Sequence, residues 1–383
     1  MKRSTVLLVA VVVALLALVS CAPKGTPPTF STPAPVIIPV PQTSQPPKAV
    51  TPEEAAWAKV VEAAKKEGTL TTYSYNFVGD VGINMTRAFK ERYGITLEIV
   101  TGRGAEFGER LKTEKRIGQM VADMTDGSAL FVENMKVEGL TTSLAGELPV
   151  LREKDAFFAD IFGVDPEYKH LIAFNFSTFT PWINTNLVKP GEEPKVWQDY
   201  LLPRWKGKML LTDPMVSAGP YQYFIPPMRE KVIDEEFLKA LNKQDIRFTN
   251  SMPDEAGLLA RGERALSIRG VDIVFARFAT EGAPIKAIAL NDGTVLSTVT
   301  TAAFKGTPHP NAAKVFINWF LSSEGQTVYG KAATVASVRK DVPNFLPVAA
   351  RVTPARPILL TNEDNEKGAK LFREHYLEKL WGR

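Results

Sequence analysis

The sequence contains very few of the residues that build disulfide frameworks and metal centres. Its 383 residues include one cysteine, Cys21, and three histidines, His170, His309 and His375. A single cysteine cannot form an internal disulfide or a cysteine-based zinc or iron–sulfur site, and the histidines are too far apart in the sequence for a His-x-x-x-His pair. The composition therefore excludes disulfide-stapled folds and the common zinc motifs, and we expect no cofactor.

Long blocks of like charge are also missing. The chain has 46 basic and 42 acidic residues, a net charge of +4, with no run of five like charges. This balance gives no electrostatic footprint for nucleic acid, so no nucleic-acid partner is expected. Hydrophobic residues make up 45% and charged residues 23% of the chain, as in soluble globular proteins. The length predicts two or three domains.

The first 21 residues have the composition of a lipoprotein signal. Two basic residues are followed by an unbroken apolar run of 14 residues at 6–19. A transmembrane helix needs about 20 such residues, so the run fits the core of a signal peptide better. It ends in Leu18-Val19-Ser20-Cys21, which resembles the bacterial lipobox, where the signal is cut before a cysteine that is then lipidated. We expect a signal peptide over 1–20 and a membrane anchor on Cys21; the alternative is a signal anchor with an incidental cysteine.

A proline-rich linker follows over 21–52. Ten of the residues in 22–52 are prolines and almost none is charged. Such a segment cannot bury a core or form a helix, so we expect an extended, semi-rigid spacer outside the cell membrane. The globular part begins near Thr51, which with Glu54 forms a capping-box pattern ahead of a helix, and Pro52 takes the first helical position.

The globular part alternates between helices and strands at its start. Helices are predicted over 52–67, 80–93 and 105–117, each followed by glycine, and strands over 69–75, 95–100 and 121–124. Such alternation predicts βαβ units and a parallel sheet. The segment 150–268 is richer in aromatic residues and turns. Later predicted elements are helices near 234–242, 253–261, 311–321 and 363–379 and a strand over 283–289.

Several stretches resemble one protein family in order and spacing. They include WAKVVEAAKKEGTL at 57–70, AFKERYGITLEIVTGRG at 88–104, INTNLVKPGEEPKVWQDYLLPRWKGKMLLTDP at 183–214 and PHPNAAKVFINWFLSSEGQTVYG at 308–330. These stretches are similar to the family 1 extracellular solute-binding proteins of ABC importers, in the branch that includes ferric-iron binders. The resemblance covers nearly all of 53–343.

The resemblance implies an α/β fold with two lobes, the type II periplasmic-binding-protein fold, in which two strands cross at the hinge. It implies a first lobe over 53–150 to which about 270–330 returns, and a second lobe over 151–268 on which about 331–383 packs. The implied function is capture of a small solute by hinge closure and its delivery to a membrane permease. A monomer is expected.

Ligands of parallel α/β sheets lie beyond the carboxyl ends of the strands, near helix N-termini. This rule and the resemblance give the candidate ligand-binding residues Tyr73, Ser74, Arg103, Gly104 and Ser128 in the first lobe and Asn184, Ser217, Gly219, Tyr221, Arg269 and Asp272 in the second. Each has a structural alternative: the tyrosines can be core or interlobe packing, the glycines and serines turns or helix caps, and the arginines surface charges.

The ferric binders of this family carry an adjacent tyrosine pair in the segment that matches Arg269 to Ile273. That stretch contains no tyrosine here, and an arginine there opposes a hard cation. Arginines and helix N-termini favour an anionic or carboxylate-bearing solute. The alternative is an organic cation held by aromatic residues, with Tyr73, Trp182, Tyr221, Asp126 and Asp272 as its candidates.

Two other functions differ from import. A solute-sensing lipoprotein that feeds a receptor has the same sequence features as a transport protein, so the two stay open. An enzyme is disfavoured, because there is no Gly-x-Ser-x-Gly nucleophile motif. The Gly-x-x-x-x-Gly-Lys at 325–331 follows a helix, and Ala332 replaces the Ser or Thr of a phosphate-binding loop.

Overall fold

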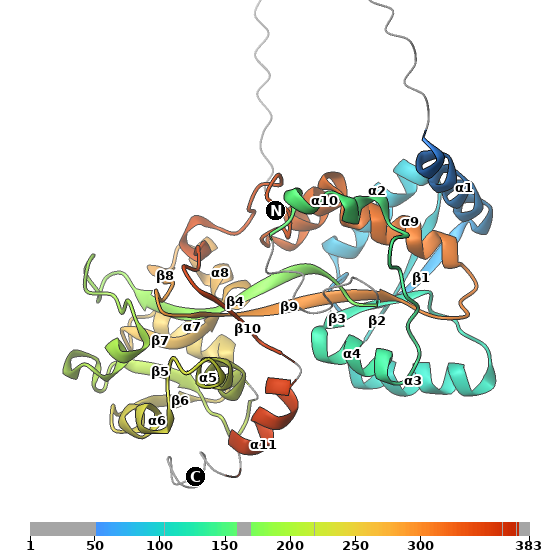
Figure 1. Cartoon of the computed structure of the whole chain (residues 1–383). Helices are drawn as coiled ribbons and strands as arrows, with labels where there is room; N and C mark the ends of the chain where they lie inside the picture. The colour runs from blue at the N-terminus through green and yellow to red at the C-terminus, as the bar shows by residue number, and fades with distance from the viewer. Residues whose placement is uncertain are drawn as a thin grey trace, which may run out of the picture. The chain divides into compact units, whose positions relative to one another are not determined.

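The computed structural model describes residues 51–102, 104–158, 170–217, 219–361, 363–372 and 374 (Figure 1). The predicted signal peptide, the lipidation site Cys21, the linker up to residue 50 and the candidate Arg103 lie outside the described residues. None of the helices in the described part is long and apolar enough to cross a membrane.

The first elements follow local signals in the sequence. They are α1 (Pro52–Glu67), β1 (Thr69–Ser74), α2 (Asp80–Tyr93), β2 (Thr96–Thr101), α3 (Gly104–Ile117), β3 (Met124–Ser128) and α4 (Ala129–Val137). The capping box of α1 is present, because Glu54 N donates to Thr51 Oγ1 (3.2 Å) and Thr51 N donates to Glu54 Oε2 (2.8 Å). Gly68 ends this helix with a φ of 73°, which glycine adopts without a steric penalty. The predicted helices at 52–67 and 80–93 are confirmed.

The third strand begins three residues later than its apolar residues predicted. Asp123, just before it, is fully buried; its backbone bonds to Thr71 O and Phe304 N, and its carboxylate makes further hydrogen bonds. Its oxygens accept hydrogen bonds from Thr71 N (2.7 Å), His309 N (2.9 Å) and the His309 ring (3.0 Å). The carboxylate therefore ties the first strand to the turn before a much later helix, a long-range contact that periodicity cannot reveal.

The remaining elements complete a mixed sheet. They are β4 (Ile172–Asn184), β5 (Met209–Thr212), α5 (Gly219–Arg229), α6 (Glu235–Asn242), β6 (Arg247–Thr249), α7 (Met252–Ala260), β7 (Leu266–Val271), α8 (Asp272–Thr280), β8 (Ile285–Ala287), β9 (Thr294–Ala303), α9 (Pro310–Phe320), α10 (Ser323–Ala333), β10 (Pro357–Leu359) and α11 (Ala369–Leu371). The main strand order is β2-β1-β3-β9-β4-β7-β5-β6, with β10 paired to β9 and β8 paired to β4.

Two long strands connect the two halves of this sheet. β9 pairs with β3 through Val299–Ala303 and with β4 through Val295–Thr301. β4 continues past β9 and pairs with β7 through Phe179–Ile183. We call the part built on β1, β2 and β3 the first lobe and the part built on β5, β6 and β7 the second lobe; β4 and β9 cross between them (Figure 1).

Helices cover each lobe separately. In the first lobe α1, α2, α9 and α10 pack on the sheet around Phe89, Phe316 and Phe320. In the second, α5 and α6 pack around Trp197 and Tyr223, while α7 and α8 form a further core with β4. The helix α8, grouped with the returning segment in the sequence analysis, packs on α7, whereas α9 and α10 lie in the core of the first lobe.

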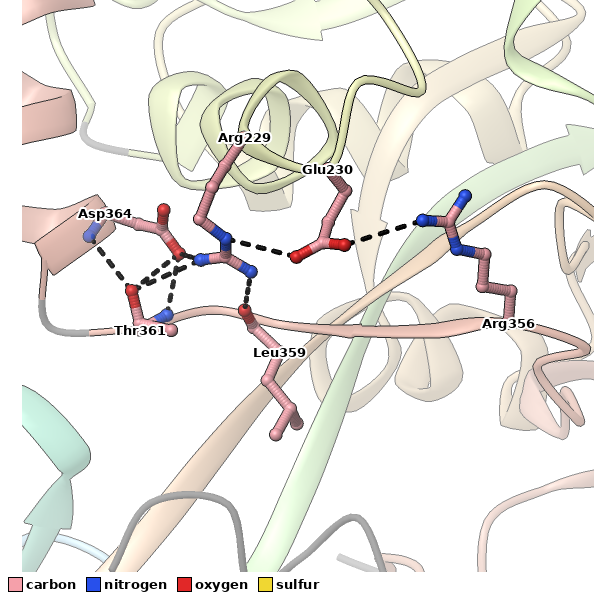
Figure 2. Close-up of polar contacts among 6 residues, drawn as sticks. All are labelled: Arg229, Glu230, Arg356, Leu359, Thr361 and Asp364. Carbon is pink, nitrogen blue, oxygen red and sulfur yellow. Dashed lines mark hydrogen bonds and ion pairs between the residues drawn. The ribbon is translucent and has the colours of Figure 1, made fainter.

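The C-terminal segment is attached to the end of α5 by a polar network. Figure 2 shows its members Arg229, Glu230, Arg356, Leu359, Thr361 and Asp364. Arg229 Nη1 donates to the buried Asp364 carboxylate, and its Nη2 donates to Leu359 O (3.1 Å). Thr361 N also donates to Asp364 (2.8 Å). Described residues of 363–374 thus dock on α5, within the predicted helix 363–379, whose remaining residues are outside the described part.

Replacing Arg229 by methionine should lower the free energy of unfolding by about 1–3 kcal/mol, because the carboxylate of Asp364 stays buried without its cation. Urea denaturation of the full chain measures this change. Arg356→Met is the matched control: its half-exposed side chain contacts Glu230 at 3.5 Å, so a change under about 0.5 kcal/mol is expected. Equal losses in both variants would contradict the assignment.

Candidate functional site

The pairing register brings the strand ends of both lobes to the same stretch of β4 and β9. Ser128 at the end of β3 pairs with Val299, which pairs with Asn175 on β4. Val271 at the end of β7 pairs with Phe179, four residues further along β4. At about 3.3 Å per strand residue, the two ends are separated by about 13 Å along β4. The carboxyl ends of the strands in the two lobes therefore face each other across a short span of the crossing strands.

The second lobe places three helix N-termini beyond its strands. β5 leads to α5, β6 to α7, and β7 to α8. α7 is capped by Ser251 Oγ, which accepts from Asp254 N (3.2 Å). The helix α5 begins at the buried Gly219, and the N–H of Gly219 donates to Ser217 Oγ. Helix N-termini carry a partial positive charge and free N–H groups, so this edge favours an anion.

Arg269 is the charged group of this edge. Its side chain is only 4% exposed, and the guanidinium carbon lies 4.2 Å from the centre of the Phe179 ring. Its one hydrogen-bonding contact is a weak one from Nη1 to the Met252 sulfur at 4.0 Å, and Nε has no partner in the described part of the chain. Burial lowers the pKa of Arg269 to about 10, so the group is still a cation at neutral pH.

Gly219 and Ser217 lie beside this guanidinium. A Cβ atom on Gly219 would come within 2.2 Å of Arg269 Nη1 and 2.9 Å of Cζ, so only glycine leaves space for the arginine in this position. Gly219 N donates to Ser217 Oγ (3.2 Å). The structure thus brings together three of the predicted residues, Arg269, Gly219 and Ser217, although their order in the chain separates them by 50 residues.

Glu255 is the nearest buried carboxylate, and its oxygens are already used. Oε1 accepts from Ser267 Oγ (2.6 Å) and Oε2 from Thr212 Oγ1 (2.6 Å). Burial raises the pKa of Glu255, and the charge of Arg269 opposes that rise. No ion pair within 4 Å joins the two groups. Arg269 therefore keeps donors for a further anion.

The tyrosines of α5 belong to the packing around this edge. Tyr223 is fully buried, lies 4.5 Å from the Trp197 ring centre, and its hydroxyl is 3.1 Å from that of Tyr200. Burial raises the pKa of Tyr223, so it is neutral. The predicted Tyr221 is half-buried on the same core.

Asp272 and Asn184 have structural partners. Asp272 Oδ2 accepts from Thr178 N (3.0 Å) and Thr178 Oγ1 (3.2 Å), and Oδ1 accepts from Ile273 N (2.8 Å), which joins the start of α8 to the crossing strand. Asn184 Nδ2 donates to Leu259 O (2.8 Å). Its N donates to Ala265 O, at the opposite end of β7 from Arg269. The structure therefore does not bring Asn184 to the other predicted residues.

In the first lobe, the structure places Tyr73 within a core. Its ring is fully buried, stacks on Phe107 at 5.0 Å and lies beneath Arg110, while its hydroxyl donates to Glu114. Burial and the Glu114 carboxylate raise its pKa. These contacts occupy the hydroxyl and the ring of Tyr73, as is expected if this tyrosine is a core residue. The carboxylate of Glu114 also accepts from Val121 N (2.9 Å).

Ser74 and Ser128 lie at the strand ends. The buried Ser74 Oγ accepts from Phe77 N (2.9 Å) and shapes the loop into α2. Ser128 is exposed and caps α4, and its N donates to the Tyr75 hydroxyl (2.9 Å). Gly104 opens α3, next to Arg103, which is outside the described residues. Ser128 and the start of α3 thus remain the positions in this lobe that a solute could contact.

The sequence indicates Asp126 only as a candidate to bind an organic cation. In the structure, its carboxylate is the least completely hydrogen-bonded buried charge described in the first lobe. It is fully buried; Oδ1 accepts from Asn76 Nδ2 (2.5 Å), and Oδ2 has no partner in the described part of the chain. Burial raises its pKa to about 6, against hydrogen bonds from the side chains of Ser74 and Asn76 and the backbone of Asn76 and Tyr75, all of which lower it. Asn175 Oδ1, on β4, is likewise buried without a partner. Asn175 was missed because its strand was not predicted.

Groups of three or more potential metal ligands do not occur within the described residues. Trp182, a candidate for an aromatic cage, is buried against Phe275 in the core of α7 and α8. The described side chains at the strand ends thus offer one buried cation in the second lobe and one buried carboxylate in the first.

Comparisons with known proteins find likeness in sequence and fold. A family model for bacterial extracellular solute-binding proteins matches residues 84–356. An uncharacterized protein of Haemophilus influenzae is 26% identical over 287 residues, covering 72% of this chain and 80% of that protein. The iron- and citrate-bound IdiA (FutA) structure from Trichodesmium has a TM-score of 0.66 at 17% identity, covering 80% of this chain and 99% of the other.

The spermidine/putrescine ABC transporter substrate-binding protein PotD of Streptococcus pneumoniae has a TM-score of 0.64 at 15% identity, covering 80% of this chain and 98% of the other. At these identities the likeness extends to the fold. The prediction of a two-lobed periplasmic-binding-protein fold is confirmed.

Proposed function

Because this chain belongs to the family of bacterial extracellular solute-binding proteins, we propose that it captures a small anionic solute between its two lobes and delivers it to the permease of an ABC importer. A solute-binding protein acts outside the cytoplasm and is not an enzyme. The proposal also includes the lipid anchor on Cys21 and a monomeric state. An anchor would keep the protein close to its permease while the linker leaves it free to turn.

The observation that carries the anionic preference is Arg269. A buried cation without a carboxylate partner costs several kcal/mol of desolvation, which a bound anion offsets. The start of α5 at Gly219 adds a positive dipole end on the same side. Arginine donates two parallel hydrogen bonds to carboxylates and phosphates, and these are stronger than neutral hydrogen bonds.

The lobes in this proposal meet at β4 and β9. The first comprises the described residues from 51 to about 175 and again from about 299 to 338, and the second those between about 176 and 298, with described residues of 357–372 docked on it. Hinge closure would bring Ser128 and the start of α3 toward Arg269. The solute stabilises the closed state by the free energy of those additional contacts.

Two other functions stay as alternatives. Related folds bind iron with citrate and polyamines, so the fold itself does not select a solute. Ferric iron or an organic cation would have to bind near the buried cation Arg269, which opposes it. A solute sensor that feeds a receptor would use the same cleft, and binding measurements alone do not separate it from a transporter.

The test is a thermal-shift screen of the full chain with small carboxylates, phosphates, phosphonates, polyamines and ferric citrate. A ligand at a hundred times its Kd adds about 2.7 kcal/mol of stability. We expect an anion to raise the melting temperature and Arg269→Met to abolish that rise. Arg351→Met, which removes an exposed arginine bound to Leu346 O (2.7 Å) far along the chain, should leave it intact. Stabilisation by polyamines or iron, unchanged in Arg269→Met, would refute the anionic preference.

A further inference from the structure

The buried charges of this protein are satisfied with two exceptions. Eight charged side chains are buried in the part of the chain that the structure describes: Glu114, Asp123, Asp126, Glu255, Arg269, Asp272, Arg339 and Asp364. Of these eight, only Asp126 and Arg269 keep a fully buried atom of the charged group, Oδ2 and Nε respectively, without a hydrogen-bond partner. One is an anion and the other a cation, and they lie in opposite lobes.

The other six show what this fold normally does with a buried charge. Arg339, for example, donates to Asp341 (2.7 Å), to Glu153 (2.7 Å) and to Leu321 O (3.2 Å). Buried polar groups are nearly always hydrogen-bonded, and an unpaired buried charge is among the costliest features a fold can carry. Two unpaired charges of opposite sign at the facing strand ends therefore need a common explanation.

The unpaired atoms of the first lobe are hydrogen-bond acceptors. Asp126 pairs with Thr301 on β9, and Asn175 pairs with Val299, two residues along the same strand and on the same face of the sheet. Burial and the Asp126 charge raise the pKa of Tyr329, and a hydrogen bond with Asn175 lowers it. Asp126 and Asn175 thus both lie near Tyr329. A protonated amine, which has N–H donors and a positive charge, satisfies both oxygens.

The second lobe offers the complementary group. Arg269 presents donors beside the N-terminus of α5, and its guanidinium lies over Phe179. Asn175 and Phe179 are about 13 Å apart along β4, and their spacing of four residues places them on the same face of that strand. A ligand that contacts both ends of this span needs its two charged groups separated by a chain of several bonds.

We infer that the solute is a zwitterion, with a carboxylate, phosphonate or phosphate bound by Arg269 and a protonated amine bound by Asp126 and Asn175. This inference rests on the proposed function and adds the second charged end. A quaternary ammonium group does not qualify, because it has no N–H donor for the two oxygens. Neither does a plain anion, which leaves Asp126 unpaired.

Isothermal titration calorimetry of the full chain tests this with matched ligands. The first series is the ω-amino acids from β-alanine to 6-aminohexanoate and the aminoalkylphosphonates of two to four carbons. The second is the same molecules without the amine, and the third the N-trimethyl forms. We expect the best amino ligand to bind at least tenfold more tightly than its des-amino partner, with the trimethyl form no better than the des-amino one.

Asp126→Asn keeps the shape and removes the charge. This variant should reduce the preference for the amino ligand to less than about threefold and keep the affinity for the des-amino ligand. Arg269→Met should abolish binding of both the amino and the des-amino ligands. Asp364→Asn, a buried acid bound to Arg229, is the matched control and should keep the full preference.

The outcomes separate this inference from the proposal beneath it. If des-amino anions bind as tightly as amino ligands, the zwitterion is refuted while the anion-binding function stands. Equal binding of the trimethyl and amino forms refutes the pairing with Asp126 and Asn175. If wild-type protein binds neither series, the proposed function itself fails. An amine preference that survives in Asp126→Asn, with the variant folded by its melting temperature, also overturns the assignment.

Discussion

Gly219→Ala is expected to weaken solute binding by at least about 100-fold while it leaves the stability of the protein nearly unchanged. The added Cβ would lie 2.2 Å from Arg269 Nη1, so the guanidinium has to move away from the start of α5. Its displacement removes two charge-assisted hydrogen bonds of roughly 1.5–3 kcal/mol each. The backbone itself accepts alanine, because Gly219 is not among the glycines with positive φ.

The measurement is calorimetric titration with the tightest ligand of the screen, together with urea denaturation. Gly257→Ala is the control: its Cβ would meet the exposed Arg261 side chain at 3.3 Å, within a helix of the same lobe. This variant should bind normally. A normal affinity in Gly219→Ala would mean that Arg269 does not contact the solute from its observed position.

Asp126→Asn should stabilise the ligand-free protein, by an amount that grows with pH. The pKa of Asp126 is about 6 in the folded state, against 3.8 for the unperturbed carboxyl, so the folded state holds the proton more tightly. Below about pH 4 both states are protonated and the charge costs nothing. Between pH 4 and 6 the native state loses stability as pH rises, and above pH 6 the full cost of about 3 kcal/mol is present.

Urea denaturation at pH 4, 5, 6 and 7 measures this difference between wild type and variant. The gain in unfolding free energy should be near zero at pH 4 and reach roughly 2–3 kcal/mol at pH 7. Asp272→Asn is the contrasting variant. Burial raises the pKa of Asp272 to about 6 as well, but both of its oxygens, unlike Asp126 Oδ2, accept hydrogen bonds, so an amide nitrogen at either position would oppose a donor. It should destabilise the protein at every pH. A pH-independent gain for Asp126→Asn would contradict the buried unpaired charge.

The sequence predicts elements with local signals better than those defined by long-range pairing. The helix over 52–67 has its capping box and its terminal glycine within the segment itself. The crossing strands β4 and β9 were not predicted, because both of their faces are largely buried and neither alternates apolar with polar residues. Pro181 also interrupts β4, where the structure has a register shift between Thr180 and Trp182. Most of their pairing partners lie more than 80 residues away in the sequence.

The same distinction applies to the site. Gly219 and Ser217 follow from the rule that ligands lie at the carboxyl ends of strands, and Arg269 follows from the family resemblance. The structure places Gly219 next to both of the others. Tyr73 obeys the same rule, yet its side chain points toward α3, because the direction of a strand residue depends on register. Asp126 became notable only when its unpaired oxygen was known. A sequence does not reveal which buried charge lacks a partner.

The position of β9 in the sheet has a consequence for how the chain can fold. Its residues, 294–303, insert between β3 and β4, which are made some 110 to 180 residues earlier. Until Ala303 is available, β3 and β4 each keep an open edge of unpaired backbone groups, and such edges pair readily with other chains. Loop closure over this distance also makes the step slow. When the chain is synthesised from its N-terminus, β3 and β4 therefore stay incompletely paired until most of the chain has been made. The insertion of β9 then completes the sheet between the two lobes in one late step.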